Sequence, residues 1–178
     1  CGGFDTHATQ HIKSMGSGTW TAKLGVLMTA FKAGTAPDAF VGLQVDGPYG
    51  VPIPYQNYAE VLLVCGGIGV TPMMALVKHL HAVWSVDPKS YPNLRLLKMV
   101  WVSRSVEELS LFSAFFEELV RVPCKAIQVE LYCSTATNDA MAAARADEVQ
   151  LPLPVKAGRP NVKEEVARLA LFNARNGV

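Results

Sequence analysis

The chain has 178 residues, half of them hydrophobic, and a formal net charge of +1 at pH 7. This length suits one domain, or one domain with part of another, and the apolar content is enough for a sizeable core. The near-neutral charge excludes nucleic acid or an anionic membrane as the expected main partner. The four cysteines show no CxxC spacing and the apolar runs are short, so we expect no disulfide scaffold, no metal site and no membrane span.

The first 50 residues combine a turn, a helix and a strand. Residues 10–15 are read as a short strand, the glycines after them as a turn, and Trp20 to Phe31 as a helix. Residues 40–45 alternate apolar with small or polar side chains, which is typical of a half-buried strand. The sequence DGPYG at 46–50 then ends that strand.

From residue 60 onward, predicted strands and helices alternate. Strands are expected over residues 60–65, 94–102 and 126–133. The helix after the first strand is indicated by an apolar stripe: Met73, Leu76, Val77, Leu80 and Trp84. The helix after the second strand opens with a capping box, residues 105–108. Its apolar stripe consists of Leu109, Phe112, Phe116 and Leu119.

The last part of the chain is less regular. Residues 134–157 are rich in Ala, Thr, Asp and Pro and predict a long flexible loop. A capped helix is expected from Asn161 to about Phe172, and the end of the chain suggests the start of a truncated strand. The whole pattern predicts an α/β fold, a Rossmann-like parallel sheet with helices on both faces.

Three glycines lie within residues 66–69, between the first buried strand and its helix. Gly67-x-Gly69-x-x-Pro72 is a variant of the phosphate-binding turn, in which missing β-carbons let a pyrophosphate approach the main chain at a positive helix end. Thr71 is expected to cap that helix and Pro72 to take its first position. A tight connection without a ligand explains a bare glycine pattern as well, so the context must decide.

The context is the end of the next strand, where Ser103 and Arg104 lie. In this architecture that position faces the adenosine ribose, where an acidic residue would favour NAD. A hydroxyl and a guanidinium suit a 2′-phosphate instead. The alternative is a solvated surface arginine, and the neighbouring glycine pattern weighs against it.

Five short motifs occur in the order that one family shows. They are HIKSMGSGTWT (11–21), DGPYG (46–50), GGIGVTP (66–72), WVSR (101–104) and GRPN (158–161). The chain resembles the FAD- and NADPH-binding dehydrogenase region of the NADPH oxidase and ferric reductase family, within the ferredoxin-NADP-reductase-like superfamily. The resemblance implies that residues 1–50 are the C-terminal remnant of a flavin-binding β-barrel domain. Residues 51–178 would be the NADPH-binding domain, truncated at its C-terminus.

The resemblance also implies where the cofactors FAD and NADPH would lie. Lys13, Trp20 and Thr21 would contact the FAD diphosphate, with a core anchor as the alternative for Trp20. The residues expected to contact NADPH are Gly66, Gly67, Ile68, Gly69, Val70, Thr71, Pro72, Ser103, Arg104, Arg159 and Pro160. For Arg159 the alternative is a surface residue at a helix start. No catalytic residue is assigned, because hydride transfer between the two rings needs position and electrostatics rather than an acid or a base.

The implied function is that of an NADPH-dependent flavin oxidoreductase on the cytosolic face of a membrane. Hydride would pass from NADPH to FAD, and electrons would pass on to haem in a transmembrane domain. The final acceptor would be oxygen, which forms superoxide or hydrogen peroxide, with ferric iron as the alternative. The expected partners are the remainder of the flavin domain and the haem domain, and regulatory subunits are further candidates.

Two motifs of the family are missing from the sequence. They are the HPFT-like segment that holds the flavin ring and the CGP-like segment beside the nicotinamide, so the isolated chain is expected to be incomplete for catalysis. A non-catalytic, dehydrogenase-like regulatory or assembly subunit is therefore a competing interpretation. A flavoprotein reductase without haem is a third.

Overall fold

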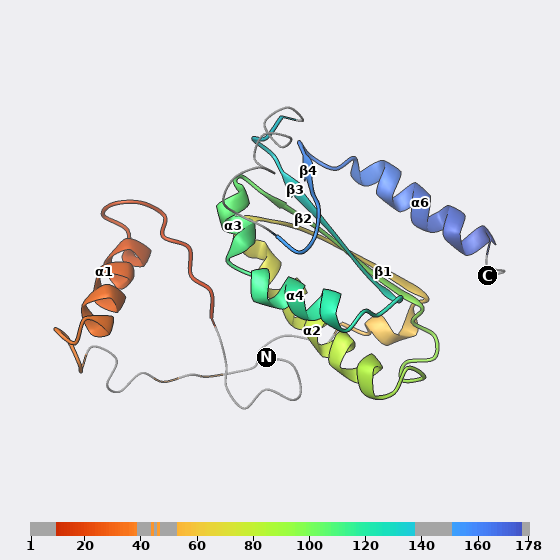
Figure 1. Ribbon diagram of the computed structural model, residues 1–178, viewed down its shortest axis with the longest axis horizontal. Coiled ribbons are helices and arrows are strands. Elements are labelled where there is room, and N and C mark those ends of the chain that lie inside the picture. Colours follow the sequence, from red (N-terminus) through yellow and green to blue (C-terminus); the bar gives the residue numbers. More distant parts are fainter. Residues whose placement is uncertain (1–9, 39–43, 45, 47–52, 138–150, 176–178) are drawn as a thin grey trace. The chain divides into compact units, whose positions relative to one another are not determined.

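The computed structural model describes residues 10–38, 44, 46, 53–137 and 151–175. It contains two compact units, a smaller one within residues 9–53 and a larger one from residue 54 onward. Both are drawn in Figure 1. The strand predicted at 40–45 and the DGPYG segment at 46–50 lie almost wholly outside the described residues.

The smaller unit confirms the predicted helix, α1 (Trp20–Lys32). Thr19 is its N-cap, because the Thr19 hydroxyl accepts a hydrogen bond from the Ala22 N–H at 3.2 Å. The strand predicted at residues 10–15 was wrong, since these residues form no strand. Trp20 is 69% exposed, so it is not the core anchor that we considered as its alternative role.

The larger unit is built on a sheet of four strands in the order β1-β2-β3-β4, with every neighbouring pair parallel. The strands are β1 (Glu60–Gly66), β2 (Leu96–Ser103), β3 (Ile127–Cys133) and β4 (Val155–Ala157). The first three were predicted to within two residues. β4 was missed, because a strand of three residues is too short for a periodic pattern. The architecture is α/β and Rossmann-like, as predicted.

Helices connect and cover the strands. They are the 3₁₀ turns η1 (Tyr55–Asn57) and η2 (Gly67–Gly69), and the α-helices α2 (Val70–Val86), α3 (Val106–Ser110), α4 (Ser113–Arg121) and α6 (Val162–Arg175). The single helix predicted after residue 105 is thus two helices, since Phe112 leaves helical geometry with φ −115° and ψ 17°. The apolar spacing continues across this break and therefore did not reveal it.

The hydrophobic core lies between one face of the sheet and the helices α2, α3 and α4. Leu97, Met99 and Trp101 of β2 point into it. The buried stripe of α2 consists of Val70, Met74, Val77, Leu80 and Trp84, together with His81. α6 lies on the opposite face of the sheet (Figure 1). Among the described residues, no helix combines the length and the apolar character that a membrane crossing requires.

Candidate functional site

β1 ends in η2 (Gly67–Gly69), which we call the glycine turn. This turn runs without interruption into α2, which begins at Val70. α2 therefore starts earlier than predicted: Thr71 is not its N-cap, and Pro72 is its third residue rather than its first. The Thr71 hydroxyl donates instead to the Ile68 carbonyl at 3.1 Å. Pro72 remains compatible with the helix, because N–H groups of the first turn have no intrahelical acceptor.

Backbone conformation and packing account for only one of the two glycines at the ends of this turn. Gly67 has a φ of +49°, a conformation that glycine adopts most easily. Gly69 has a φ of −62° and a ψ of −6°, which any residue can adopt. A β-carbon added to Gly69 would have no described atom within 4 Å. Close approach of a ligand to the main chain would give this position a reason to lack a side chain.

Trp101 of β2 holds the glycine turn in place. Its side chain is 1% exposed, and its Nε1–H donates to the Gly67 carbonyl at 2.9 Å. Its ring packs edge-on against Phe112, with ring centroids 5.3 Å apart, and also contacts Phe116. A buried indole N–H needs an acceptor, and here the acceptor belongs to the turn. The sequence contained Trp101 within the WVSR motif, but its contact with the turn could not be foreseen.

β2 ends at Ser103, which places Arg104 at the same edge of the parallel sheet as the glycine turn. The Arg104 carbonyl accepts hydrogen bonds from the Thr135 hydroxyl and from the Cys133 thiol. The Arg104 side chain is exposed and has no ion-pair partner among the described residues. Ser103 is 2% exposed, and its hydroxyl donates to the Glu108 carboxylate. Of the two residues, Arg104 is accessible and Ser103 is already engaged.

β4 brings the GRPN motif to this edge as well. The Gly158 N–H donates to the Cys133 carbonyl at 2.8 Å, directly where β3 and β4 end together. Arg159 follows with an exposed side chain, and Pro160 is half-buried. Arg104 and Arg159 thus both extend from the carboxyl edge of the sheet, where parallel α/β proteins bind ligands. Thr135 and β4 were missed because both lie in the segment that we had read as a loop.

The remaining residues predicted to contact a cofactor differ in how far their side chains are exposed. Ile68 is 43% exposed, whereas the Val70 side chain is fully buried, so only the backbone of Val70 can face a ligand. The three residues expected to contact FAD lie around the start of α1, in the smaller unit. There Lys13 is exposed, and the Thr21 hydroxyl accepts from the Met15 N–H at 3.0 Å.

The carboxyl edge offers binding groups rather than reactive ones. Burial raises the pKa of the Cys65 thiol at the end of β1 to about 11, so this thiol stays protonated at neutral pH. Within the described ranges, no three His, Cys, Asp or Glu side chains are grouped in a way that could hold a metal ion. Exposed guanidinium groups and the backbone of a helix start suit the recognition of an anion.

Comparisons with known proteins show the family of this chain. The family described as "Ferric reductase NAD binding domain" matches residues 58–177. The heavy chain of a superoxide-generating NADPH oxidase of Dictyostelium discoideum is 30% identical over 118 residues, which cover 61% of this chain and 22% of that protein. "Ferric reduction oxidase 7, chloroplastic" of Arabidopsis thaliana is 36% identical over 118 residues, with coverage of 61% and 15%. "NADPH oxidase 4" of Rattus norvegicus is 39% identical over 72 residues, with coverage of 40% and 12%.

The chain corresponds to only a part of each of these relatives. The alignments span no more than 22% of the length of each of these relatives, whereas the family match covers most of the present chain. The chain belongs to the ferric reductase NAD-binding domain family.

Proposed function

We propose that the chain is the NADPH-binding domain of a flavin-dependent oxidoreductase of the NADPH oxidase and ferric reductase type. The observation that carries this proposal is Gly69, at a helix start on the carboxyl edge of a parallel sheet. Neither its φ nor its packing against the described residues requires a glycine there. A pyrophosphate that lies against the main chain would need the missing β-carbon. The names of the relatives, NADPH oxidases and a ferric reduction oxidase, support the same function.

In this proposal NADPH lies across Gly67 to Pro72, with its pyrophosphate at the positive end of α2. The 2′-phosphate would be bound by Arg104 and Arg159, whose exposed guanidinium groups suit it by charge and by bidentate geometry. Ser103 would contact the phosphate only by exchanging its present hydrogen bond to Glu108. The residues therefore bind and orient the nucleotide, and none of them acts as an acid or a base.

We further propose FAD as the acceptor of the hydride, with Lys13, Trp20 and Thr21 at its diphosphate. Flavin chemistry would convert the two-electron hydride transfer into single-electron steps. The electrons would pass to haem in a transmembrane domain and then to oxygen, with this domain on the cytosolic side and regulatory subunits as candidate partners. Ferric iron is a second candidate acceptor, which the 36% identity to ferric reduction oxidase 7 favours.

The Gly69→Ala variant tests the nucleotide site. We expect NADPH to bind at least about tenfold more weakly, a loss of about 1.4 kcal/mol, because the new methyl group occupies the space of the pyrophosphate. The same change should raise the free energy of unfolding by about 0.4–1 kcal/mol, because alanine restricts the unfolded chain. Calorimetric titration with NADPH and unfolding in urea measure the two effects.

Gly25→Ala is the matched control, since Gly25 lies inside α1 and an added β-carbon there would also have no described atom within 4 Å. Its NADPH affinity should equal that of the unmodified chain. The preference for the 2′-phosphate is tested by titrating NADPH and NADH separately into the unmodified chain and into Arg104→Ala. Unchanged NADPH binding by Gly69→Ala would refute the proposed site, and failure of the unmodified chain to bind either nucleotide would favour a non-catalytic subunit.

A further inference from the structure

α6 is attached to the sheet through charged side chains. Lys98 of β2 lies between core-facing residues in sequence and therefore points to the opposite face, which α6 covers. Lys98 is 5% exposed and Glu165 of α6 is 2% exposed. Among residues 162–170, the part of α6 whose side chains are described, Glu165 is the one buried residue, whereas Val166 is 54% exposed. The described part of α6 thus meets the sheet through ion pairs, beside Leu96 and Val100, which share the face of β2 with Lys98 and are also buried.

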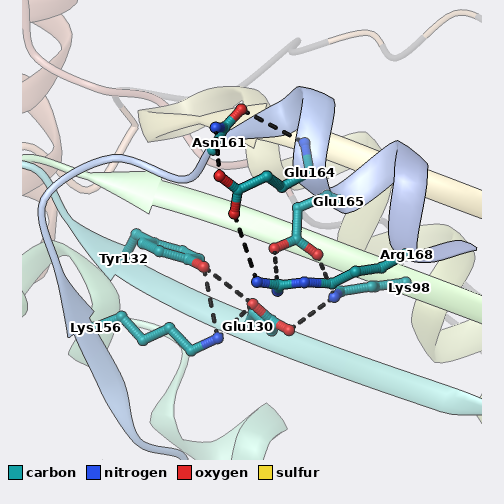
Figure 2. A network of polar contacts seen from close by, with 8 residues as sticks. All are labelled: Lys98, Glu130, Tyr132, Lys156, Asn161, Glu164, Glu165 and Arg168. Carbon is teal, nitrogen blue, oxygen red and sulfur yellow. Dashed lines mark hydrogen bonds and ion pairs between the residues drawn. The ribbon is translucent and has the colours of Figure 1, made fainter.

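Lys98 joins two carboxylates beneath the helix. Its Nζ lies 2.5 Å from Glu165 Oε2 and 2.7 Å from Glu130 Oε1 (Figure 2). The other Glu130 oxygen accepts from Lys156 Nζ at 2.6 Å and from the Tyr132 hydroxyl at 3.1 Å. Burial raises the pKa of Glu130, but the hydrogen bonds from Lys156 and Lys98 outweigh it and bring that pKa down to about 2. Glu130 is therefore ionised at neutral pH.

The contacts continue from Glu165 to the first turn of α6. Arg168 Nη1 lies 2.8 Å from Glu165 Oε1, and Arg168 Nη2 lies 3.6 Å from Glu164 Oε2. Asn161 Nδ2 donates to Glu164 Oε1 at 2.7 Å, and the Glu164 N–H donates to Asn161 Oδ1 at 3.4 Å. Figure 2 shows this run of contacts from the sheet to the helix start. It ends two residues after Arg159.

The position of Arg159 is therefore determined from two sides. On one side, the Gly158 N–H is bonded to the end of β3. On the other, Asn161 caps α6, whose place on the sheet depends on Lys98 and Glu165. Three carboxylates and three cations balance in this cluster: Glu130, Glu164, Glu165, Lys98, Lys156 and Arg168. A neutral cluster supplies position without adding a net charge beside an anionic ligand.

We propose that Lys98 and Glu165 are positioning residues for nucleotide binding, which fix α6 on the sheet and thereby hold Arg159 where the 2′-phosphate of NADPH binds. This inference rests on the proposed function and extends it to two buried residues outside the binding edge. Lys98 and Glu165 are too buried to serve as exposed phosphate contacts, so they act through Arg159.

The test is calorimetric titration of NADPH and NADH into the full chain and into Glu165→Gln, Arg159→Ala and the double variant. Glu165→Gln should weaken NADPH binding about three- to tenfold and leave NADH binding within about twofold. Loss of a negative charge would by itself strengthen the binding of an anion, so weaker binding identifies a positional effect. In the double variant the loss should not exceed that of Arg159→Ala alone, because both changes act on the same contact.

Glu117→Gln on α4 removes the same charge from an exposed position and should leave NADPH binding unchanged. Thermal unfolding confirms that each variant is folded. If Glu165→Gln is not, Glu165→Met replaces it, because this change also removes a negative charge. Additive losses in the double variant, or equal losses for NADPH and NADH, would overturn the inference. If the unmodified chain binds neither nucleotide, the proposed function fails as well. If Arg159→Ala weakens NADPH binding and Glu165→Gln does not, this inference alone fails.

Discussion

The two faces of the sheet are covered by different kinds of interaction. On one face, α2 and α4 bury apolar side chains, of which Leu80 and Phe116 are fully buried. On the other, α6 is joined to the sheet through Lys98, Glu130 and Glu165. Apolar burial is non-directional and stabilises in proportion to area, whereas buried charges require a specific geometry and all of their partners. The first face therefore contains the large apolar core, and the second adds ion pairs of specific geometry beside the buried Leu96 and Val100.

This difference bears on the proposed site, because residues from both faces lead to the same edge of the sheet. Trp101 points into the apolar core and is bonded to Gly67 of the glycine turn. Lys98 points to the charged face and is bonded to α6, which follows Arg159. In this proposal, the pyrophosphate end of the site is held by the packing of Trp101 and its hydrogen bond to Gly67, and Arg159 at the 2′-phosphate end is held through the ion pairs of α6.

The largest effect is expected on the apolar face. Phe116→Ala should lower the free energy of unfolding by about 3–5 kcal/mol, because it leaves a cavity beside Trp101 and Phe115. Urea unfolding at low and high NaCl concentration measures this loss, which should be the same at both. Leu111→Ala, at a position 79% exposed, is the control and should change stability by less than about 0.5 kcal/mol. A strongly salt-dependent loss for Phe116→Ala would contradict the assignment of this face as apolar.

On the charged face, Lys98→Met should cost about 2 kcal/mol, because Glu165 stays buried with only Arg168 as a cation. Adding Glu165→Leu should recover at least half of this loss, since an apolar pair needs no matching charge. Urea unfolding of the four proteins in a double-mutant cycle provides the coupling energy. The comparison of the faces would fail if the double variant were less stable than either single variant.

The smallest effect concerns acid. The pKa of Glu130 lies at about 2, below its usual value of 4.5, so the folded chain binds this proton less readily than the unfolded chain. Its contribution, about 1–2 kcal/mol, is therefore present above about pH 4.5 and is lost as the pH falls toward 2. Glu130→Gln lacks this contribution at neutral pH and should converge with the unmodified chain near pH 2. The measurement is the urea midpoint of both proteins between pH 2 and 7. If the difference between the two midpoints does not change with pH, the proposed contribution of the Glu130 ion pairs is contradicted.

Much of the fold followed from local patterns. β1 and β3 were predicted almost to the residue, because continuous or alternating apolar residues are visible in a short window. β4 was not, because Val155–Ala157 becomes a strand only by pairing with β3. The start of α2 was misplaced, since the glycine turn already has helical geometry at Gly69.

The site was predictable to a similar degree. Arg104 and Arg159 were proposed from motifs and do lie at one edge of the sheet, as the parallel topology requires. The WVSR motif did not reveal the hydrogen bond from Ser103 to Glu108, because this bond depends on how α3 packs against β2. The predicted contacts of these residues with NADPH stay predictions.

By itself, the sequence determined the α/β class, the three longer strands and the family motifs, because periodic burial and a missing β-carbon are local properties of the chain. Only the tertiary structure decided which charges meet. Lys98 and Glu165 are 67 residues apart, and their contact depends on the register of the sheet and on the face that α6 covers. Ion pairs of this kind have no local pattern, since each partner alone looks like an ordinary polar residue.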